Sequence, residues 1–307
     1  MTPDNTLAFR PLKGLHEPSA ILQLPDGRFL VVEDEPKHPF SLFRIGLDDQ
    51  VSSAPLSTEI QGSNKALRKL DDLEGLTADR HGNIYAITSH SRNADGKQKK
   101  SRDRLVRFRI ESDRIIDPIV VTGLKPALLE AHPILHAAAK IRDVKDDDGI
   151  NIEALEISAD QQNLLIGFRS PLLDNRALIA TVENHAAMFE ADEAIRISNA
   201  LITLNLEGDG IRGMSWLPAL NTYLLISGPS SGGQVQFKLW RWSGQPDEPA
   251  LRLSVPGLLG LEHAEGVCPA VIDGQPKIIF VSDDGSKKQD RFAHFLLLDP
   301  AQLDLDP

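Results

Sequence analysis

Short apolar runs separated by polar turns recur along the chain and predict strands. In the clearest stretch the runs lie at 76–78, 84–88, 105–110 and 115–121, and the segment 79–83 between the first two is rich in turn residues. Apolar and basic residues alternate over 105–110, which is typical of a half-buried strand, and a short turn between two such runs indicates a hairpin. This stretch therefore predicts four antiparallel strands in about fifty residues.

A four-residue signature precedes or opens each such unit. It consists of an apolar residue, a charged residue, a small residue and another apolar residue, and it occurs at 73–76, 152–155, 211–214 and 264–267, with a fainter copy at 18–21. The second positions of the five copies are Ser19, Glu74, Glu153, Arg212 and Glu265. A four-stranded unit that recurs at this period is typical of a propeller blade.

Five repeats predict an all-β fold, a five-bladed β-propeller that takes up residues 1–307 as a single domain. The last repeat lacks an outer strand, so we expect the spare strand at 7–10 to pair with it and close the ring, because closure removes exposed sheet edges. Six blades are an alternative, since the interval between the second and third repeats is the longest. The apolar pattern at about 125–145 instead favours a short helical insertion, which Pro126 and Pro133 would divide.

Composition and charge narrow the classes of function. The formal net charge of −11 disfavours nucleic acid and anionic membranes as partners, because those bind basic surfaces. No apolar run is long enough to span a bilayer, and no export signal is visible at the start, so we expect a cytoplasmic protein. Cys268 is the only cysteine, which excludes an internal disulfide. The sequence leaves open whether a protein partner exists.

Blade geometry predicts where the charged residues meet. In a propeller the start of the first strand and the end of the second lie on one face, so both sets should surround one mouth of the central channel. The first set is the five signature residues. The second set includes Asp34, His90, Arg169, Asp283 and Asp284. The sequence therefore predicts a mainly acidic pocket that also contains arginine and histidine.

Three glutamates around one axis would repel one another and raise each other's pKa unless a positive charge compensates them. A Ca²⁺ or Mg²⁺ ion bound by Glu74, Glu153 and Glu265 is one way to supply it, because carboxylate oxygens suit hard cations. Arg169 and Arg212 could supply it instead by ion pairing. A third interpretation is that the carboxylates accept hydrogen bonds from neighbouring blades and hold the ring closed.

These residues suggest a cation-assisted hydrolase of small anionic esters or phosphoesters. Asp283, Asp284 or His90 would position or deprotonate a water molecule. Substrate binding would fall to a mixed polar set in which the guanidinium groups pair with substrate oxyanions. That set is Arg169, Arg212, Ser19 and Asp34. The alternative is a non-catalytic propeller that binds a ligand or a protein across the same face.

The motifs also resemble a known family. The segments 72–76, 151–155, 210–214, 227–229 and 282–285 look like those of a bacterial family described only as a domain of unknown function. More distantly, the Glu-Gly-Leu sequence at a blade start is similar to esterase-like phytase domains and calcium-activated nucleotidase propellers. That resemblance implies a calcium-dependent phosphoester hydrolase with its site at the channel mouth. Ser19 and Arg212 stand where those relatives would have carboxylates.

Overall fold

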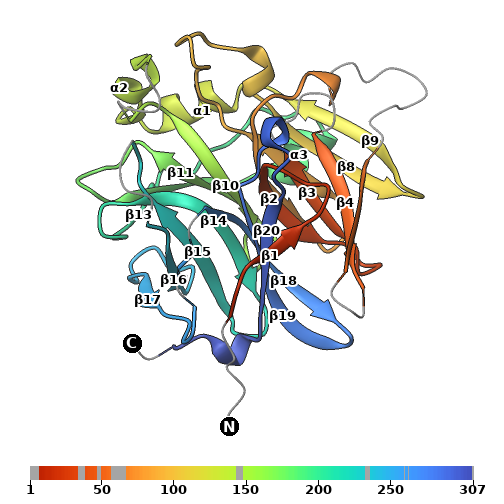
Figure 1. The fold of residues 1–307 in the computed structure, drawn as a ribbon. Coiled ribbons are helices and arrows are strands. Elements are labelled where there is room, and N and C mark those ends of the chain that lie inside the picture. Colours follow the sequence, from red (N-terminus) through yellow and green to blue (C-terminus); the bar gives the residue numbers. More distant parts are fainter. Residues whose placement is uncertain are drawn as a thin grey trace.

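Five four-stranded antiparallel sheets make up the protein (Figure 1). The computed structural model describes residues 7–33, 39–46, 50–56, 67–142, 148–231, 236–258, 260–261 and 263–305. Each sheet is one blade. In four of the blades the strands follow one another in sequence from the inside of the molecule to the outside, and in the fifth the N-terminal strand is outermost. The fold is therefore all-β, as the sequence predicts.

The blades share one strand order, which runs from the innermost strand outward. Blade 1 consists of β2 (Pro18–Gln23), β3 (Phe29–Glu33), β4 (Phe40–Ile45) and β5 (Val51–Pro55). Blade 2 consists of β6 (Leu73–Ala78), β7 (Ile84–Thr88), β8 (Leu105–Glu111) and β9 (Arg114–Val121). Blade 3 consists of β10 (Asn151–Ile157), β11 (Leu164–Ser170), β12 (Ala177–Val182) and β13 (Ile202–Leu204). Blade 4 consists of β14 (Gly210–Leu217), β15 (Thr222–Gly228), β16 (Lys238–Trp242) and β17 (Leu251–Leu253). Blade 5 consists of β18 (Ala264–Ile272), β19 (Gln275–Ser282), β20 (Ala293–Leu298) and β1 (Arg10–Leu12).

The inner strands form a closed ring. β2 contacts β6, β6 contacts β10, β10 contacts β14, β14 contacts β18, and β18 returns to β2. No place is left in this ring for a sixth blade. The protein is a five-bladed β-propeller, and the alternative of six blades is wrong.

The N-terminal strand closes the last blade. β1 pairs with β20 in antiparallel register, with Arg10 opposite Phe295 and Leu12 opposite Ala293. The prediction of closure is confirmed, but the strand begins at Arg10 rather than at Leu7. Leu7 instead makes an isolated bridge with Leu258 in the segment that follows β17.

The hydrophobic core is divided among the spaces between adjacent blades. Five clusters of buried apolar side chains lie between blades 1 and 2, 2 and 3, 3 and 4, 4 and 5, and 5 and 1. Alternating residues of each strand therefore pack against two different neighbours. Burial of apolar surface on both sides of each sheet stabilises the ring as a whole.

The hairpin turns are built by the residue types that the sequence places there. Between β6 and β7, Asp79 Oδ1 accepts the backbone N–H groups of His81 and Asn83, both at 2.9 Å. Gly82 adopts a φ of +80°, which glycine tolerates because it has no Cβ. The turn fixes the register of the two strands and so aligns their ends at the channel.

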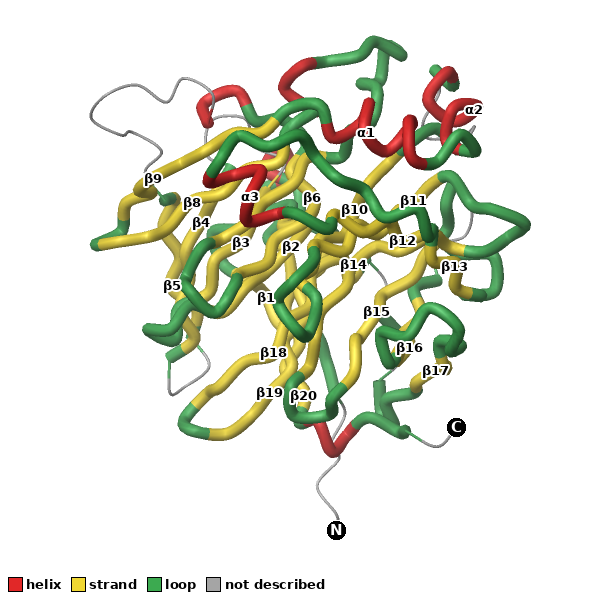
Figure 2. Tube along the Cα trace, turned by 180° about the vertical axis from the view of Figure 1, so that it is seen from behind, coloured by secondary structure: helices red, strands yellow, loops and turns green. Residues whose placement is uncertain are grey.

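Helices are short and few in the described part of the chain. α1 (Leu124–Ala131) and α2 (Leu135–Lys140) lie where the sequence predicts a helical insertion, and Pro133 lies in the break between them. Figure 2 shows both helices at the end of the molecule opposite the chain termini. α3 (His185–Glu190) follows β12. The remaining helical turns are η1 (Leu67–Lys69), η2 (Lys100–Arg102), η3 (Lys287–Gln289) and η4 (Pro300–Gln302). Among the described helices, none has the length and apolar character to cross a membrane.

Candidate functional site

A β-bulge in every inner strand positions the second residue of the signature. In β10, Ile152 pairs with Phe168 and Ala154 pairs with Gly167, so the residue between them has no cross-strand partner. The register is interrupted at the same place in the other four inner strands. The residues at these bulges are Ser19, Glu74, Glu153, Arg212 and Glu265. Bulges redirect a side chain and are frequent beside functional sites.

The bulged residues converge at one end of the central channel, which we call the channel mouth. Ser19, Glu74, Glu153 and Glu265 line a single narrow space there. Its volume is about 10 Å³, which is the room that about one water molecule needs. The channel below the mouth is therefore nearly filled by protein.

The third signature residue is small because neighbouring inner strands almost touch at this level. A Cβ atom on Gly213 would lie 2.1 Å from the carbonyl oxygen of Glu265, and one on Gly75 would lie 2.7 Å from the Cβ atom of Leu155. Both distances are well inside van der Waals contact. The small residue lets the blades approach closely enough for the charged side chains beside it to meet.

Arg212 joins two of the glutamates. Its Nη1 atom lies 3.1 Å from Glu153 Oε2 and 3.0 Å from Glu265 Oε1, while its Nη2 atom donates a hydrogen bond to the carbonyl oxygen of Pro229. The guanidinium also lies 5.0 Å from the centre of the Phe237 ring. The side chain is only 9% exposed. The two carboxylates outweigh the effect of burial and raise the pKa of Arg212, so blades 3, 4 and 5 are linked by a permanent positive charge.

Glu153 is the most fully paired of the glutamates. Its Oε1 atom accepts hydrogen bonds from Asn151 Nδ2 at 2.8 Å and from Arg169 Nη1 at 3.1 Å. With Arg212 on its other oxygen, this carboxylate contacts two cations. The arrangement matches the interpretation in which arginines compensate the acidic ring.

Glu265 and Glu74 are compensated less well. Burial and repulsion from Glu153 raise the pKa of Glu265 to about 7, although Arg212 opposes the shift. Loss of hydration raises the pKa of Glu74 well above its ordinary value, and nearby carboxylates, first Asp72, add to the shift. No described residue makes a hydrogen bond or ion pair with the Glu74 carboxyl group. Glu74 is therefore the acidic group at the mouth that holds a proton most readily.

A second ion-paired group lies beside Glu74. Arg102 binds Asp72 through Nη1 at 2.8 Å and Asp71 through Nε at 3.2 Å. Asp72 also accepts hydrogen bonds from the hydroxyl groups of Ser89 and Ser91. Sequence reasoning missed Asp72 and Arg102 as site residues. The available signals were the position of Asp72 just before the signature and that of Arg102 within the basic run 97–104.

The residues expected to position or deprotonate a water molecule lie in different surroundings. His90 is buried; its Nδ1 atom lies 2.7 Å from the carbonyl oxygen of Thr88 and its Nε2 atom 3.2 Å from Asp103 Oδ1. These contacts of the imidazole ring are with blade 2 and its loop and not with the glutamates. Burial lowers the pKa of His90. Asp283 lies near enough to Glu74 to contribute to its raised pKa. The structure thus brings Asp283, but not His90, toward the channel mouth.

Asp284 pairs with a histidine that the sequence analysis did not single out. Its Oδ2 atom lies 2.8 Å from His294 Nδ1, and its Oδ1 atom accepts the Ser282 hydroxyl at 2.5 Å. Burial acts to raise the pKa of Asp284, but these hydrogen bonds outweigh it and the pKa is lowered. Of the expected substrate-binding residues, Ser19, Arg169 and Arg212 lie at the mouth, and Asp34 lies outside the described residues.

Two of the three glutamates that were predicted to bind a metal ion pair with an arginine instead. The Arg212 guanidinium lies between Glu153 and Glu265, two of the three residues proposed to hold a cation. Within the described ranges, no three acidic, histidine or cysteine side chains are grouped as a metal site would require. Ca²⁺ or Mg²⁺ at Glu74 stays a prediction.

The fold and this site define the class: a five-bladed β-propeller with a mixed arginine–glutamate cluster at one mouth of its channel. The chain belongs to the family described as "Protein of unknown function (DUF3616)", whose profile matches residues 128–299. The resemblance to a domain of unknown function is thereby confirmed. No curated protein matches the chain, and the similarity to phytase-like and nucleotidase propellers stays a prediction.

Solved structures are similar to the chain at low sequence identity. A putative oxidoreductase (glucose dehydrogenase) from Thermus thermophilus is 16% identical, with 95% of this chain and 100% of that chain covered and a TM-score of 0.48. The GH43B protein of the xyloglucan PUL of Bacteroides ovatus is 12% identical, with 94% and 53% covered and a TM-score of 0.50. An aldose sugar dehydrogenase from Streptomyces coelicolor is 13% identical, with 95% and 98% covered and a TM-score of 0.42. These similarities concern the fold alone.

Proposed function

We propose that the channel mouth is the active site of a hydrolase for small esters or phosphoesters, with Glu74 as the proton-transfer group. The observation that carries the proposal is that Glu74 has a raised pKa and no partner among the described residues. Arg212 lies near enough to interact with it electrostatically, and Arg169 is held on the neighbouring Glu153. A general acid or base works best when its pKa is near the operating pH. The upward shift of the Glu74 pKa, caused mainly by burial, is in the direction that this requirement demands.

Arg169 is the group that we assign to the substrate. Its Nη1 atom is fixed on Glu153, and its side chain is 21% exposed, more than that of Arg212. A guanidinium that is held by one carboxylate still has donors for an oxyanion. A charged ester group would then lie between Arg169 and the proton on Glu74. In an ion-assisted form of the reaction a divalent cation would take the place of that proton, because a carboxylate that binds a cation is deprotonated, and the cation would add a second positive charge beside the substrate.

The test is turnover of p-nitrophenyl acetate, p-nitrophenyl phosphate and bis(p-nitrophenyl) phosphate, each with Ca²⁺, with Mg²⁺ and with EDTA. We expect Glu74→Gln to lower kcat/KM at least about a hundredfold, because proton transfer contributes on that scale, and to remove one limb of the pH profile. Glu111→Gln, at an exposed position at the end of β8, is the matched control and should behave as wild type. Stimulation by an ion that EDTA abolishes would support the ion-assisted form of the reaction.

Absence of turnover with all three substrates, or full activity in Glu74→Gln, would contradict the proposal. The alternative, a propeller that binds a ligand or protein without catalysis, is favoured by one observation. Arg169 and Arg212 both pair with Glu153, and Arg212 also pairs with Glu265, so the network ties blades 3 to 5 together as a structural network would. In that case Glu74→Gln should leave the melting temperature nearly unchanged and no substrate should be cleaved.

A further inference from the structure

A second, larger pocket lies at the other end of the central channel. Its lining includes Ile21, Leu76, Glu156, Leu217 and Cys268, whereas the bulged residues Ser19, Glu74, Glu153 and Glu265 line only the space at the channel mouth. The narrow space of about 10 Å³ at the mouth adjoins the pocket at Ile21 and Leu76, which line both. None of the polar side chains that line the pocket lines the space at the mouth, so the two differ in their chemistry.

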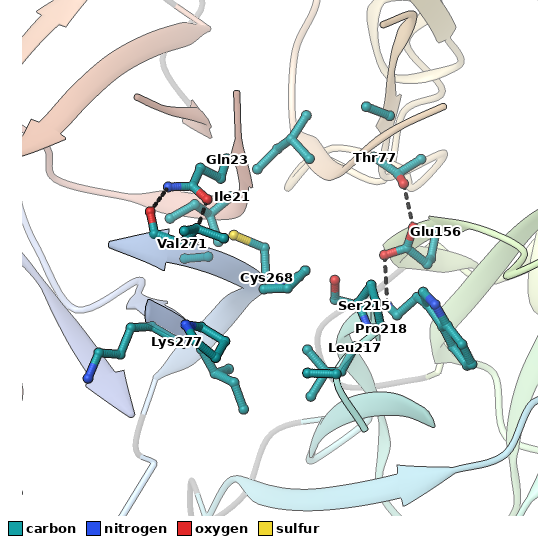
Figure 3. Close-up of a pocket in the computed structure, with 18 of the residues that line it drawn as sticks. Ile21, Gln23, Thr77, Glu156, Ser215, Leu217, Pro218, Cys268, Val271 and Lys277 are labelled. Atoms are coloured by element: carbon teal, nitrogen blue, oxygen red, sulfur yellow. Dashed lines mark hydrogen bonds between the residues drawn. The ribbon is translucent and has the colours of Figure 1, made fainter. Parts of the chain in front are cut away.

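The pocket has the size and the wall of a small-molecule site. Its volume is about 440 Å³, within the range of roughly 300–1,000 Å³ that is usual for ligand pockets. Figure 3 shows Gln23 and Val271 on one side, Glu156 and Thr77 on the other, and Leu217 and Pro218 below Glu156. Most of its lining is aliphatic, with proline and alanine beside the larger side chains. Such a wall binds mainly by excluding water from apolar surface.

Glu156 and Gln23, two polar side chains of the wall, are already paired within the protein. Glu156 accepts hydrogen bonds from the Thr77 hydroxyl at 2.5 Å and from the backbone N–H group of Trp216 at 3.1 Å. Both ends of the Gln23 amide bond the backbone of Val271, and these contacts are drawn as dashed lines in Figure 3.

The charged side chains in the wall of the pocket are also paired or buried. Lys277 Nζ lies 2.6 Å from Asp299 Oδ1, and Glu156 is only 7% exposed. A charged ligand entering the pocket would lose its hydration and would find the wall's polar groups already engaged, which is unfavourable. The wall therefore selects against charge of either sign.

We propose that this pocket binds an uncharged, mainly apolar small molecule. The volume sets its size, the aliphatic wall supplies the contact surface, and the internal pairing of Glu156, Gln23 and Lys277 excludes charged analogues. The ligand enters from the face opposite the channel mouth, so it can be present while that mouth is occupied.

The test uses two fluorescent probes of one scaffold that differ by a charged group: N-phenyl-1-naphthylamine, which is uncharged, and its 8-sulfonate. With the full chain we expect saturable binding of the uncharged probe and at least about tenfold weaker binding of the sulfonate, equivalent to a difference of one decade in Kd. Competition by 1-naphthylmethylammonium should be equally weak. Stronger binding of either charged compound than of the uncharged probe would overturn the proposal.

Substitutions in the wall of the pocket test whether the uncharged probe binds there. Ala78 and Ala219 both line the pocket, so Ala78→Trp and Ala219→Trp should narrow it. Ala219 is exposed, whereas Ala78 is partly buried against the cluster between blades 1 and 2. We expect each to weaken the uncharged probe at least about tenfold. Ala200→Trp, at an exposed position outside the pocket, is the control and should bind as wild type. If Ala78→Trp fails to fold, Ala219→Trp still decides: unchanged affinity there would overturn the assignment.

Discussion

At the scale of single residues, the molecule buries carboxyl groups at both ends of its channel, and their surroundings differ. At the mouth, arginines neutralise Glu153 and Glu265 directly. At the opposite end, Glu156 is stabilised by hydrogen bonds alone, and no ion pair to it occurs among the described residues. A carboxylate that loses its hydration without gaining a cation prefers its protonated form. Burial accordingly raises the pKa of Glu156 to about 7, against the effect of its hydrogen bonds.

This shift predicts how stability depends on pH. The pKa of Glu156 is higher in the folded chain than the ordinary value of 4.5, so the folded state binds more protons between about pH 4.5 and 7. Stability therefore falls as pH rises through that window, by about 3 kcal/mol for this one group. Glu265 has a shift of the same sign and adds to the fall. In Glu156→Gln, urea unfolding at pH 5 and at pH 7.5 should differ less than in wild type.

Glu111→Gln is the control for this experiment, because that carboxyl group is exposed. Its free energy of unfolding should follow the wild-type dependence on pH. An unchanged slope in Glu156→Gln would show that the buried carboxyl group does not contribute the expected term.

At the scale of single elements, the bulge and the small residue after it form one structural unit, which recurs in the inner strand of all five blades. The bulge turns the charged side chain into the channel, and the small residue lets the neighbouring strand approach. Sequence reasoning could find the signature, because its spacing is visible, and it could place the five residues on one face from strand order. It could not find the bulges, because an interruption of register depends on the partner strand. Nor could it show that Arg212 reaches Glu153 and Glu265, which depends on the distance between blades.

The tight contact after the bulge predicts the effect of one methyl group. Gly213→Ala would place a Cβ atom 2.1 Å from the Glu265 carbonyl oxygen, so β14 and β18 would have to move apart. We expect a loss of roughly 1–3 kcal/mol, as for other overpacked sites, measured as a lower midpoint of urea unfolding. Ala154 holds the equivalent place in blade 3, and Ala154→Gly, the reverse change, should cost less. Equal stability of Gly213→Ala and wild type would contradict the proposed role of the small residue.

At the scale of the whole molecule, the ring is closed by pairing the two ends of the chain. β1 completes the blade that β18 to β20 begin, and Leu12 is fully buried in the cluster between blades 5 and 1. Sequence reasoning predicted this closure from a missing outer strand. It placed the closing strand three residues too early, because the pairing is decided by the edge of β20 and not by the apolar run 7–9. It also missed the pocket around Glu156, whose residues look like ordinary strand positions.

The closure of the ring predicts that equivalent substitutions in two outermost strands will differ in their effect on stability. Leu12→Ala should cost about 2–5 kcal/mol, as for other buried leucines, and should speed hydrogen exchange of the β20 amides. Leu251→Ala is the matched control, because Leu251 also lies in an outermost strand but is 44% exposed; a change within about 0.5 kcal/mol is expected there. Similar losses in the two variants would mean that β1 is no more important than any outer strand.

The five bulges give the channel mouth five equivalent positions, which we call sockets, and each socket holds one side chain. Each socket is framed by its own hairpin and by the glycine or alanine that follows it. The side chain that a socket presents can therefore change while the frame persists. One serine, one arginine and three glutamates are the combination in this chain, and single-codon steps could convert it into others. A scaffold of this kind lets the chemistry of a site diverge faster than the fold that carries it.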